Sequence, residues 1–192
     1  MYESRAELET LHGRKKVSTR YQEGAKRVVS HYKDRPGFKR LDIVFCLTGG
    51  IYPTVDLTRS IARLKPAFPV AIHPFVASRY GDKQHGDATV QLHEVPGRGI
   101  PSNADILLVD DILDQGLTLQ ACVEMIRRER NPRSVHCYVH SIRQGCTIPE
   151  GVELLCKPLE LTGDLWGVGH GMSDSEGYLR GLDEIATIPI LA

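Results

Sequence analysis

The amino-acid sequence predicts an α/β protein built on a central parallel sheet flanked by helices. Short apolar runs typical of buried strands recur along the chain, and amphipathic stretches with helical spacing lie between them. The 192 residues, 41% hydrophobic and 25% charged, suit one globular domain with a sizeable core. Because strands alternate with helices, parallel pairing through right-handed crossovers is the simplest arrangement.

The first half of the chain predicts two helices and two strands. Apolar residues recur at helical spacing over residues 17–32, and the sequence Asp34-Arg-Pro-Gly37 ends this helix. The apolar run at residues 43–47 predicts a buried strand followed by a tight turn at Thr48-Gly49-Gly50. A helix is expected over residues 53–64, with a proline in its first turn, and the next strand over residues 70–76.

The second half begins with a different kind of segment. Residues 78–103 are polar and rich in glycine, which predicts a hairpin-like excursion able to close over a site. Residues 105–109 predict the cleanest buried strand, a helix follows from Leu119, and another strand is expected near residues 135–142. Ligands of parallel sheets bind beyond the carboxyl ends of the strands, which directs attention to residues 110–118.

Charge and composition exclude several classes of protein. The 24 basic and 24 acidic residues give zero net charge, although residues 1–40 are basic, and this balance argues against a nucleic-acid coat or a polybasic membrane binder. No apolar run resembles a signal peptide or approaches the roughly 20 residues of a membrane span. The five cysteines form no CxxC pair and predict reduced thiols in a cytoplasmic protein: Cys46, Cys122, Cys137, Cys146 and Cys156.

The acidic segment is the strongest chemical signal. Asp110 and Asp111 stand at a predicted strand end, where carboxylates can hold sugar hydroxyls or a hydrated divalent cation, and Asp114 follows. Gly116 permits close backbone approach and Thr118 lies in the first turn of a helix, whose N–H groups make an anion site. Together these features predict a sugar phosphate ligand. The alternative explanation at this point is structural: the three acids cap the N-terminus of a helix, where the helix dipole stabilises them.

The order of residues in this segment resembles a known motif. Residues 106–118 match the phosphoribosyl-pyrophosphate motif of type I phosphoribosyltransferases: four apolar residues, two acids, two apolar residues, an acid, a polar residue, Gly, any residue and Thr. Residues 47–50 resemble the pyrophosphate-binding turn of the hypoxanthine-guanine branch, residues 78–81 the start of its mobile catalytic loop, and residues 166–182 its purine hood. The resemblance spans roughly residues 40 to 185.

The resemblance implies a fold and a domain organisation. It implies the type I phosphoribosyltransferase fold, with a central parallel sheet flanked by helices, a small hood subdomain and a mobile loop. Residues 1–192 would form one phosphoribosyltransferase domain. Its core would span about residues 40–145, and its hood about residues 150–192 together with the N-terminal segment.

The resemblance also implies roles for individual residues. Asp114 would be the catalytic general acid/base, facing N7 of a purine, and Asp110 and Asp111 would bind the ribose hydroxyls. The 5-phosphate loop would consist of Asp114, Gln115, Gly116, Leu117 and Thr118. Pyrophosphate would be held by Thr48, Gly49 and Arg180. The mobile loop would open with Ser78, Arg79, Tyr80 and Gly81.

The purine site departs from the family pattern in detail. The lysine that reads the 6-oxo group has Arg143 as its best counterpart, with Lys157 as an alternative. Trp166 would stack on the base, with Gly167 beside it. Ser173 and an extra residue intervene in the hood before Asp174, which would lie beside the exocyclic group or a second magnesium. The implied cofactor is Mg²⁺, with Asp110, Asp111 and Asp174 as its ligands.

The resemblance therefore implies a purine salvage enzyme. It would transfer phosphoribose from phosphoribosyl pyrophosphate to hypoxanthine or guanine, giving IMP or GMP and pyrophosphate. Its partners would be these two substrates, with no nucleic acid and no membrane, and it would assemble as a homodimer or homotetramer. The alternatives are a non-catalytic protein that senses phosphoribosyl pyrophosphate or a nucleotide, and a transferase for another base such as xanthine or a pyrimidine.

Two further patterns predict no site. The glycines of Gly167-Val-Gly169-His-Gly171 lack the third position of a dinucleotide fingerprint and no βαβ unit follows them. His136 and His140 are four residues apart in a predicted strand, where about 13 Å would separate them at ~3.3 Å per residue, too far to share a metal ion.

Overall fold

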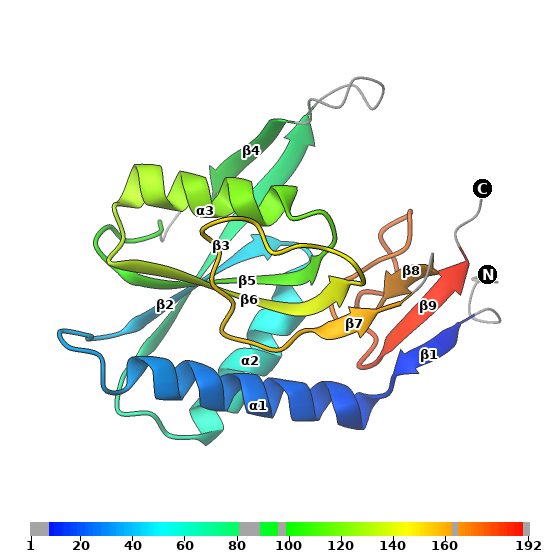
Figure 1. Cartoon of the computed structure of the whole chain (residues 1–192), viewed down its shortest axis with the longest axis horizontal. Helices are drawn as coiled ribbons and strands as arrows, with labels where there is room; N and C mark the ends of the chain where they lie inside the picture. The colour runs from blue at the N-terminus through cyan, green and yellow to red at the C-terminus, as the bar shows by residue number, and fades with distance from the viewer. Residues whose placement is uncertain (1–7, 81–88, 96–98, 163–164, 190–192) are drawn as a thin grey trace.

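The computed structural model describes residues 8–80, 89–95, 99–162 and 165–189, which form two sheets and three helices (Figure 1). In chain order the elements are β1 (Glu9–His12), α1 (Arg14–Tyr32), β2 (Leu41–Leu47), α2 (Ile51–Arg63), β3 (Val70–Tyr80), β4 (Thr89–Glu94), β5 (Asp105–Leu113), α3 (Leu117–Arg130), β6 (Ser134–Arg143), β7 (Leu159–Leu161), β8 (Leu165–Val168) and β9 (Ile185–Pro189).

The larger sheet confirms the predicted parallel α/β architecture. Its six strands follow the order β4-β3-β2-β5-β6-β7, and every pair is parallel except β3 with β4. Helices α1 and α2 cover one face of the sheet and α3 the other (Figure 1). The antiparallel pair β3–β4 is the hairpin that the polar segment predicts, although residues 81–88 lie outside the described part of the chain.

Strand β5 is longer than the sequence predicts. Its parallel pairing with β6 continues to Leu113, which lies opposite Ile142 and is buried. Asp110 and Asp111 therefore belong to the strand itself and do not follow it. The pairing keeps alternate side chains on opposite faces, so the two neighbouring carboxylates leave the strand in different directions.

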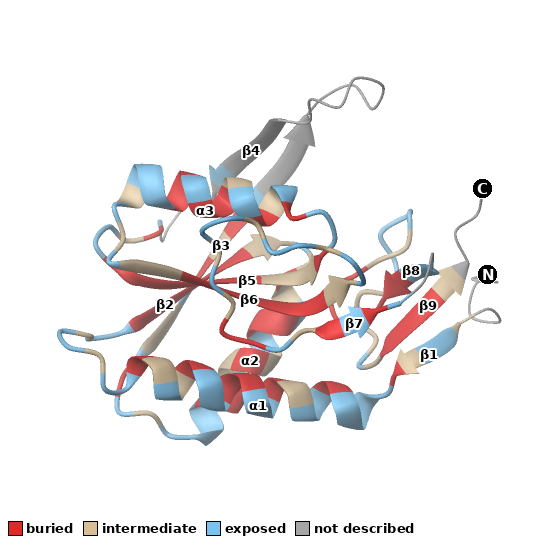
Figure 2. Cartoon of the chain, viewed as in Figure 1, coloured by how far each residue is buried: buried red, intermediate tan, exposed pale blue. Residues whose placement is uncertain are grey.

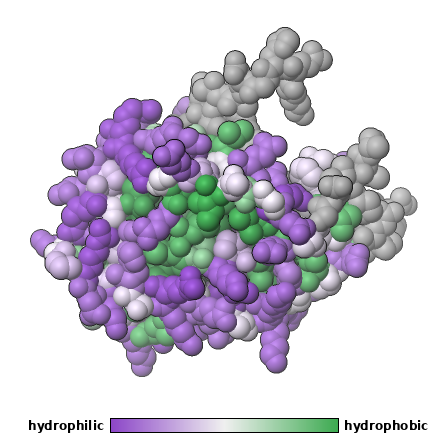
Figure 3. All heavy atoms as spheres, viewed as in Figure 1, coloured by the Kyte–Doolittle hydropathy of each residue, from purple (hydrophilic) through white to green (hydrophobic). Residues whose placement is uncertain are grey.

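The core lies between the sheet and its helices. The central strands β2 and β5 are buried on both faces, as Figure 2 shows, because helices cover both sides. Helix α1 buries the predicted stripe, including Val17, Tyr21, Ala25, Val28 and Tyr32. Each fully buried large apolar side chain of this kind contributes about 1.5–3 kcal/mol. Polar side chains dominate the outer surface, with an apolar area between α1 and α3 (Figure 3).

The smaller sheet joins the two ends of the chain. Strands β1, β9 and β8 pair antiparallel, and the sheet lies at the end of the molecule beyond β7 (Figure 1). Stacked aromatic rings connect it to the core: Tyr21 of α1 lies 4.3 Å from the ring of His140, and His170 packs against both. Burial holds the pKa of His140 well below its usual value, so this contact is between neutral rings. The boundaries predicted between core and hood stay a prediction.

The cysteines are free, as the sequence predicts, and the cytoplasmic location stays a prediction. All five lie in described segments, no disulfide joins them, and Cys122, Cys137 and Cys156 are buried. Burial raises the pKa of the Cys137 and Cys156 thiols to about 12, which keeps them protonated. Among the described helices, none has the length and apolar character needed to cross a membrane.

Candidate active site

A pocket of about 430 Å³ opens where β2 and β5 end and α3 begins. Three parts of the chain meet there: the turn after β2, the segment from the acids of β5 to the first turn of α3, and Arg180. These parts include nine of the residues singled out from the sequence, namely Thr48, Gly49, Asp110, Asp111, Asp114, Gln115, Gly116, Thr118 and Arg180. The pocket therefore lies at the carboxyl end of the parallel sheet, where the sequence predicts a ligand site.

The two neighbouring acids of β5 differ in their surroundings. One carboxylate oxygen of Asp110 accepts a hydrogen bond from the backbone N–H of Asp111 (3.0 Å), and one oxygen of Asp111 accepts from the N–H of Ile112 (2.8 Å). Burial raises the pKa of Asp111, while the hydrogen bond from Ile112 and the charge of Arg180 act in the opposite direction. Asp111 is therefore a partly buried carboxylate that a cation in the pocket would stabilise.

The turn after β2 is built around a close backbone approach. A Cβ atom added to Gly49 would overlap the carboxylate of Asp111, so glycine is required for the turn to lie against β5. The peptide bond between Leu47 and Thr48 is cis. Thr48 is exposed and lines the pocket together with Gly49, which puts backbone and hydroxyl groups opposite the acids.

The loop after β5 ends at the N-terminus of α3. Gly116 adopts the left-handed conformation (φ 81°) as the N-cap residue, and its carbonyl accepts the hydrogen bond of Gln120 N–H (2.9 Å). Thr118, two residues after Gly116, lines the pocket, whereas Leu117 is half exposed and does not line it. The first N–H groups of a helix have no partner within it, so this end of α3 offers donors and a positive dipole to an anion.

Arg180 closes the pocket from the side of the smaller sheet. Its guanidinium donates a hydrogen bond to the carbonyl of Gly171, and its charge counteracts the raised pKa of Asp111. The segment around Gly171 itself packs tightly on Gly49 and Asp111. The arginine is therefore held at a fixed place beside the acids, where it can neutralise a second anionic group.

Asp114 belongs to a chain of contacts that leads out of the pocket. Its carboxylate accepts a hydrogen bond from Arg143 Nε (2.7 Å), and Arg143 Nη1 donates to the carbonyl of Leu165 (2.8 Å). Trp166, next in β8, is 44% exposed and donates from Nε1 to the carbonyl of Ser173 (2.5 Å). These contacts connect Asp114, which lines the pocket, through Arg143 to the backbone of β8, where Trp166 follows Leu165.

A family model described as a phosphoribosyl transferase domain matches residues 18–153 of this chain. The match covers the ends of β2 and β5 and the start of α3, which line the pocket, together with α2 and β6. The chain belongs to the phosphoribosyltransferase family. Its central sheet and helices have the type I phosphoribosyltransferase fold.

Individual relatives agree along nearly the whole chain. The hypoxanthine-guanine phosphoribosyltransferase of Dictyostelium discoideum is 26% identical over 171 residues, which cover 88% of this chain and 89% of the relative. The enzyme of the same name from Mycobacterium tuberculosis is 26% identical and covers 90% and 81%. The hypoxanthine phosphoribosyltransferase of Trypanosoma cruzi, solved with its product IMP, has a TM-score of 0.77 at 25% identity, covering 98% and 94%.

The pocket of this phosphoribosyltransferase also fits the implied magnesium ion. Mg²⁺ prefers oxygen ligands, keeps several waters and binds through one or two carboxylates together with substrate phosphates. Asp110 and Asp111 supply such carboxylates at the pocket wall. Asp174 does not line the pocket. One of its oxygens accepts hydrogen bonds from the N–H groups of Glu176 and Tyr178, so its predicted metal and purine roles stay predictions.

The segment predicted to be a mobile loop lies only partly in the described residues. Ser78, Arg79 and Tyr80 end strand β3, where their backbones pair with β4, and Gly81 lies outside the described residues. The described residues of the predicted lid therefore belong to the edge hairpin β3–β4. Its role in closing over the pocket stays a prediction.

Sequence reasoning missed several parts of the site. The pocket is also lined by Cys46, Ile112, Leu113 and Leu119. Strand and helix periodicity predicts that these residues are buried but does not predict that they line a site. The contact between Arg143 and Asp114 was also missed, because 29 residues separate them. The contact follows from the parallel pairing of β5 with β6, because Asp114 and Arg143 both stand at the carboxyl ends of these strands.

Proposed function

We propose that this protein is a purine salvage phosphoribosyltransferase of the hypoxanthine-guanine type. The observation that carries the proposal is the pocket in which two neighbouring acids, the N-terminus of α3 and the cationic Arg180 meet. The names of its relatives support a 6-oxopurine as the acceptor. The products would be the nucleoside monophosphate and pyrophosphate.

The 5-phosphate and the ribose would occupy the side of the pocket nearest α3. The phosphate binds the first N–H groups of α3 and the Thr118 hydroxyl, because donors and dipole both favour an anion there. Asp110 and Asp111 accept hydrogen bonds from the ribose hydroxyls. Magnesium, when bound, neutralises the pyrophosphate and so favours its departure.

The pyrophosphate would lie across the pocket against the turn after β2. Thr48 and the backbone of Gly49 hold it from one side, and Arg180 from the other. Displacing pyrophosphate from the anomeric carbon develops positive charge on the ribose and negative charge on the leaving group. Arg180 is fixed by its bond to Gly171 and needs little rearrangement to stabilise that negative charge.

The purine would lie at the pocket mouth between Asp114 and Trp166. Asp114 serves as the general acid/base for the ring nitrogen, and Arg143 holds its carboxylate in place. Arg143, which also contacts the Leu165 carbonyl, would read the 6-oxo group of the base with its remaining guanidinium donors. Trp166, tied to Ser173, offers a ring face for stacking.

The remaining assignments concern the setting of the reaction. The segment that begins at Ser78 would close over the pocket and keep water from the ribose cation. We propose Mg²⁺ as the cofactor, a homodimer or homotetramer as the assembly, and the cytoplasm as the location.

The test is a pyrophosphate-release assay with Mg²⁺, phosphoribosyl pyrophosphate and a panel of bases. The proposal expects turnover with hypoxanthine or guanine, and little with adenine or pyrimidines. Turnover with xanthine alone would change the acceptor but keep the chemistry. Binding of phosphoribosyl pyrophosphate without turnover on any base would contradict the proposal and identify a sensor.

A further inference from the structure

Three potential metal ligands meet at the opposite end of the molecule from the pocket. His31 in the last turn of α1, His136 near the start of β6 and Glu153 each offer a ligand atom, and these atoms lie within 4.8 Å of one another. His136 precedes Arg143 by seven residues on β6, about 23 Å along an extended strand. The cluster is therefore separate from the acids of the candidate active site.

A buried tyrosine orients the central histidine. The hydroxyl of Tyr32 lies 2.8 Å from His136 Nδ1, and it donates to the carbonyl of Ile106 at 3.4 Å. In the tautomer that metal binding requires, the hydroxyl donates to Ile106 and accepts the N–H of His136 Nδ1. This leaves the lone pair on Nε2, which faces Glu153 at 3.5 Å. Metal-binding histidines commonly have this kind of partner on the second ring nitrogen.

The spacing of the three ligands fits a tetrahedral site after small side-chain rotations. Bonds of about 2.0–2.1 Å to zinc put tetrahedral ligand atoms about 3.3 Å apart. The distance between His136 and Glu153 is already close to that value. Glu153 is 66% exposed and His31 is half-buried, so both can rotate towards His136, whose ring is 4.3 Å from that of His31.

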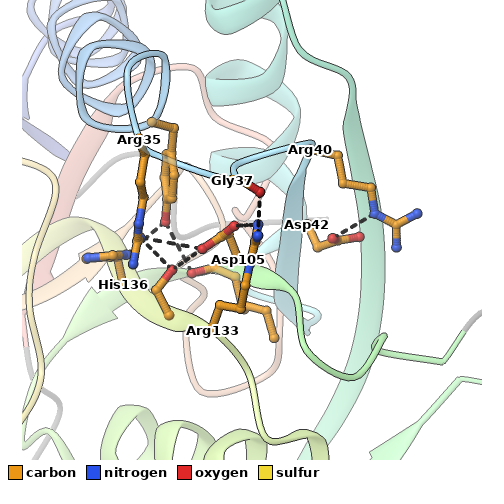
Figure 4. Close-up of polar contacts among 10 residues, drawn as sticks. Arg35, Gly37, Arg40, Asp42, Asp105, Arg133 and His136 are labelled. Carbon is orange, nitrogen blue, oxygen red and sulfur yellow. Dashed lines mark hydrogen bonds and ion pairs between the residues drawn. The ribbon is translucent and has the colours of Figure 1, made fainter.

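The surrounding charges and space permit a cation. Arg35 lies beside His136, but its guanidinium donates to Ser134 (2.8 Å) and pairs with Asp105 at 3.5 Å (Figure 4). An open hollow of about 330 Å³ beside both histidines leaves room for solvent to complete the coordination.

We propose that His31, His136 and Glu153 form a binding site for a divalent transition metal of the zinc class. Two imidazoles and one carboxylate are a ligand set that Zn²⁺ accepts with a solvent molecule in the fourth position. The ion would fasten the end of α1 to β6 and to the segment that leads into β7. The effect expected is structural stabilisation, independent of the reaction at the other end of the sheet.

The test is a Co²⁺ and Zn²⁺ titration of the untagged full chain, stripped of metal by a chelator and kept in excess Mg²⁺. Excess Mg²⁺ occupies the carboxylate sites, so that they do not compete for Co²⁺. Co²⁺ bound by His31, His136 and Glu153 gives the strong visible absorption of a four-coordinate ion. We expect one equivalent to bind, and Zn²⁺ at 100 times its Kd to raise Tm by about 5–10 °C.

Matched variants locate the site. His31→Gln and Glu153→Gln change side chains that are not fully buried, so both variants should fold, and each should weaken Co²⁺ binding by about 10-fold or more. His93→Gln, at an exposed histidine elsewhere, and Asp110→Asn, in the candidate active site, should leave it unchanged. Absence of saturable binding, or binding that survives both ligand variants, would overturn the proposal. Loss of the signal in Asp110→Asn would do so as well.

Discussion

The two ends of strand β5 use the same residue type for opposite purposes. At its amino end, Asp105 is 2% exposed; it bonds to Arg133, accepts from Ser134 (2.7 Å) and lies 3.5 Å from Arg35 (Figure 4). Asp42 of the neighbouring strand is similarly held by Arg40 and His73. The chain thus neutralises these carboxylates with its own cations, as burial of charge requires.

At the carboxyl end of β5 the acids face a pocket. Asp110, Asp111 and Asp114 line it, and burial raises the pKa of Asp111 although Arg180 is close. The chain bears a folding cost there that a bound cation and sugar would remove. The contrast teaches that carboxylates buried against arginines serve the fold, whereas carboxylates that line a pocket are accessible to a ligand, and the following predictions test that difference.

The largest expected effect is on catalysis at the carboxyl end. Asp114→Asn keeps the shape of the side chain and an acceptor for Arg143, but it removes the general acid/base. We expect kcat to fall by about 10²-fold or more, with nucleotide affinity nearly unchanged. Steady-state kinetics and nucleotide binding measure both quantities. Unchanged turnover would remove Asp114 from this role.

The converse effect is expected at the amino end. Asp105→Asn leaves Arg35 and Arg133, each about two-thirds buried, without their carboxylate. We expect a loss of about 2 kcal/mol in the free energy of unfolding, because breaking a buried pair is costly and partial exposure reduces that cost. Denaturant unfolding measures it. The exposed control Asp34→Asn should change stability by less than about 0.5 kcal/mol, and kcat of folded Asp105→Asn should match the wild type.

A smaller effect is expected where the turn after β2 meets β5. In Gly49→Ala the new methyl group would displace the carboxylate of Asp111, so kcat/KM for phosphoribosyl pyrophosphate should fall by about 10-fold. Gly13→Ala is the control, because a Cβ there meets no atom within 4 Å. Equal kinetics in the two variants would show that the close approach is not needed for binding.

The smallest effect concerns pH and Asp111. A carboxyl group whose pKa is raised by folding stabilises the protein while protonated, and this contribution is lost as pH rises through the folded pKa. Asp111→Asn should therefore raise Tm slightly at pH 7 without ligand or Mg²⁺. The gain should disappear towards the unfolded pKa of about 3.9. Thermal unfolding across pH measures the difference, and a lower Tm at pH 7 would contradict it.

Local sequence predicts much of this molecule. The apolar runs and the order Asp110-Asp111-Ile-Leu-Asp114 predicted the sheet, the pocket wall and the helix that begins at the pocket, because these features depend on residues close in sequence. The pairs Arg143–Asp114 and Asp105–Arg133 and the cluster of His31, His136 and Glu153 were not predicted. Each joins distant segments, and only the strand order and helix packing bring them together.

Calorimetric titration of the protein with phosphoribosyl pyrophosphate, in the presence of Mg²⁺ and without a base, tests the central claim most directly. The wild type should bind saturably. Asp110→Asn and Asp111→Asn should each weaken binding by about 10–100-fold, the usual cost of losing a charged hydrogen bond, while Asp105→Asn should bind as the wild type does. Equal weakening by all three variants, or by none, would contradict the division of labour between the two ends of β5.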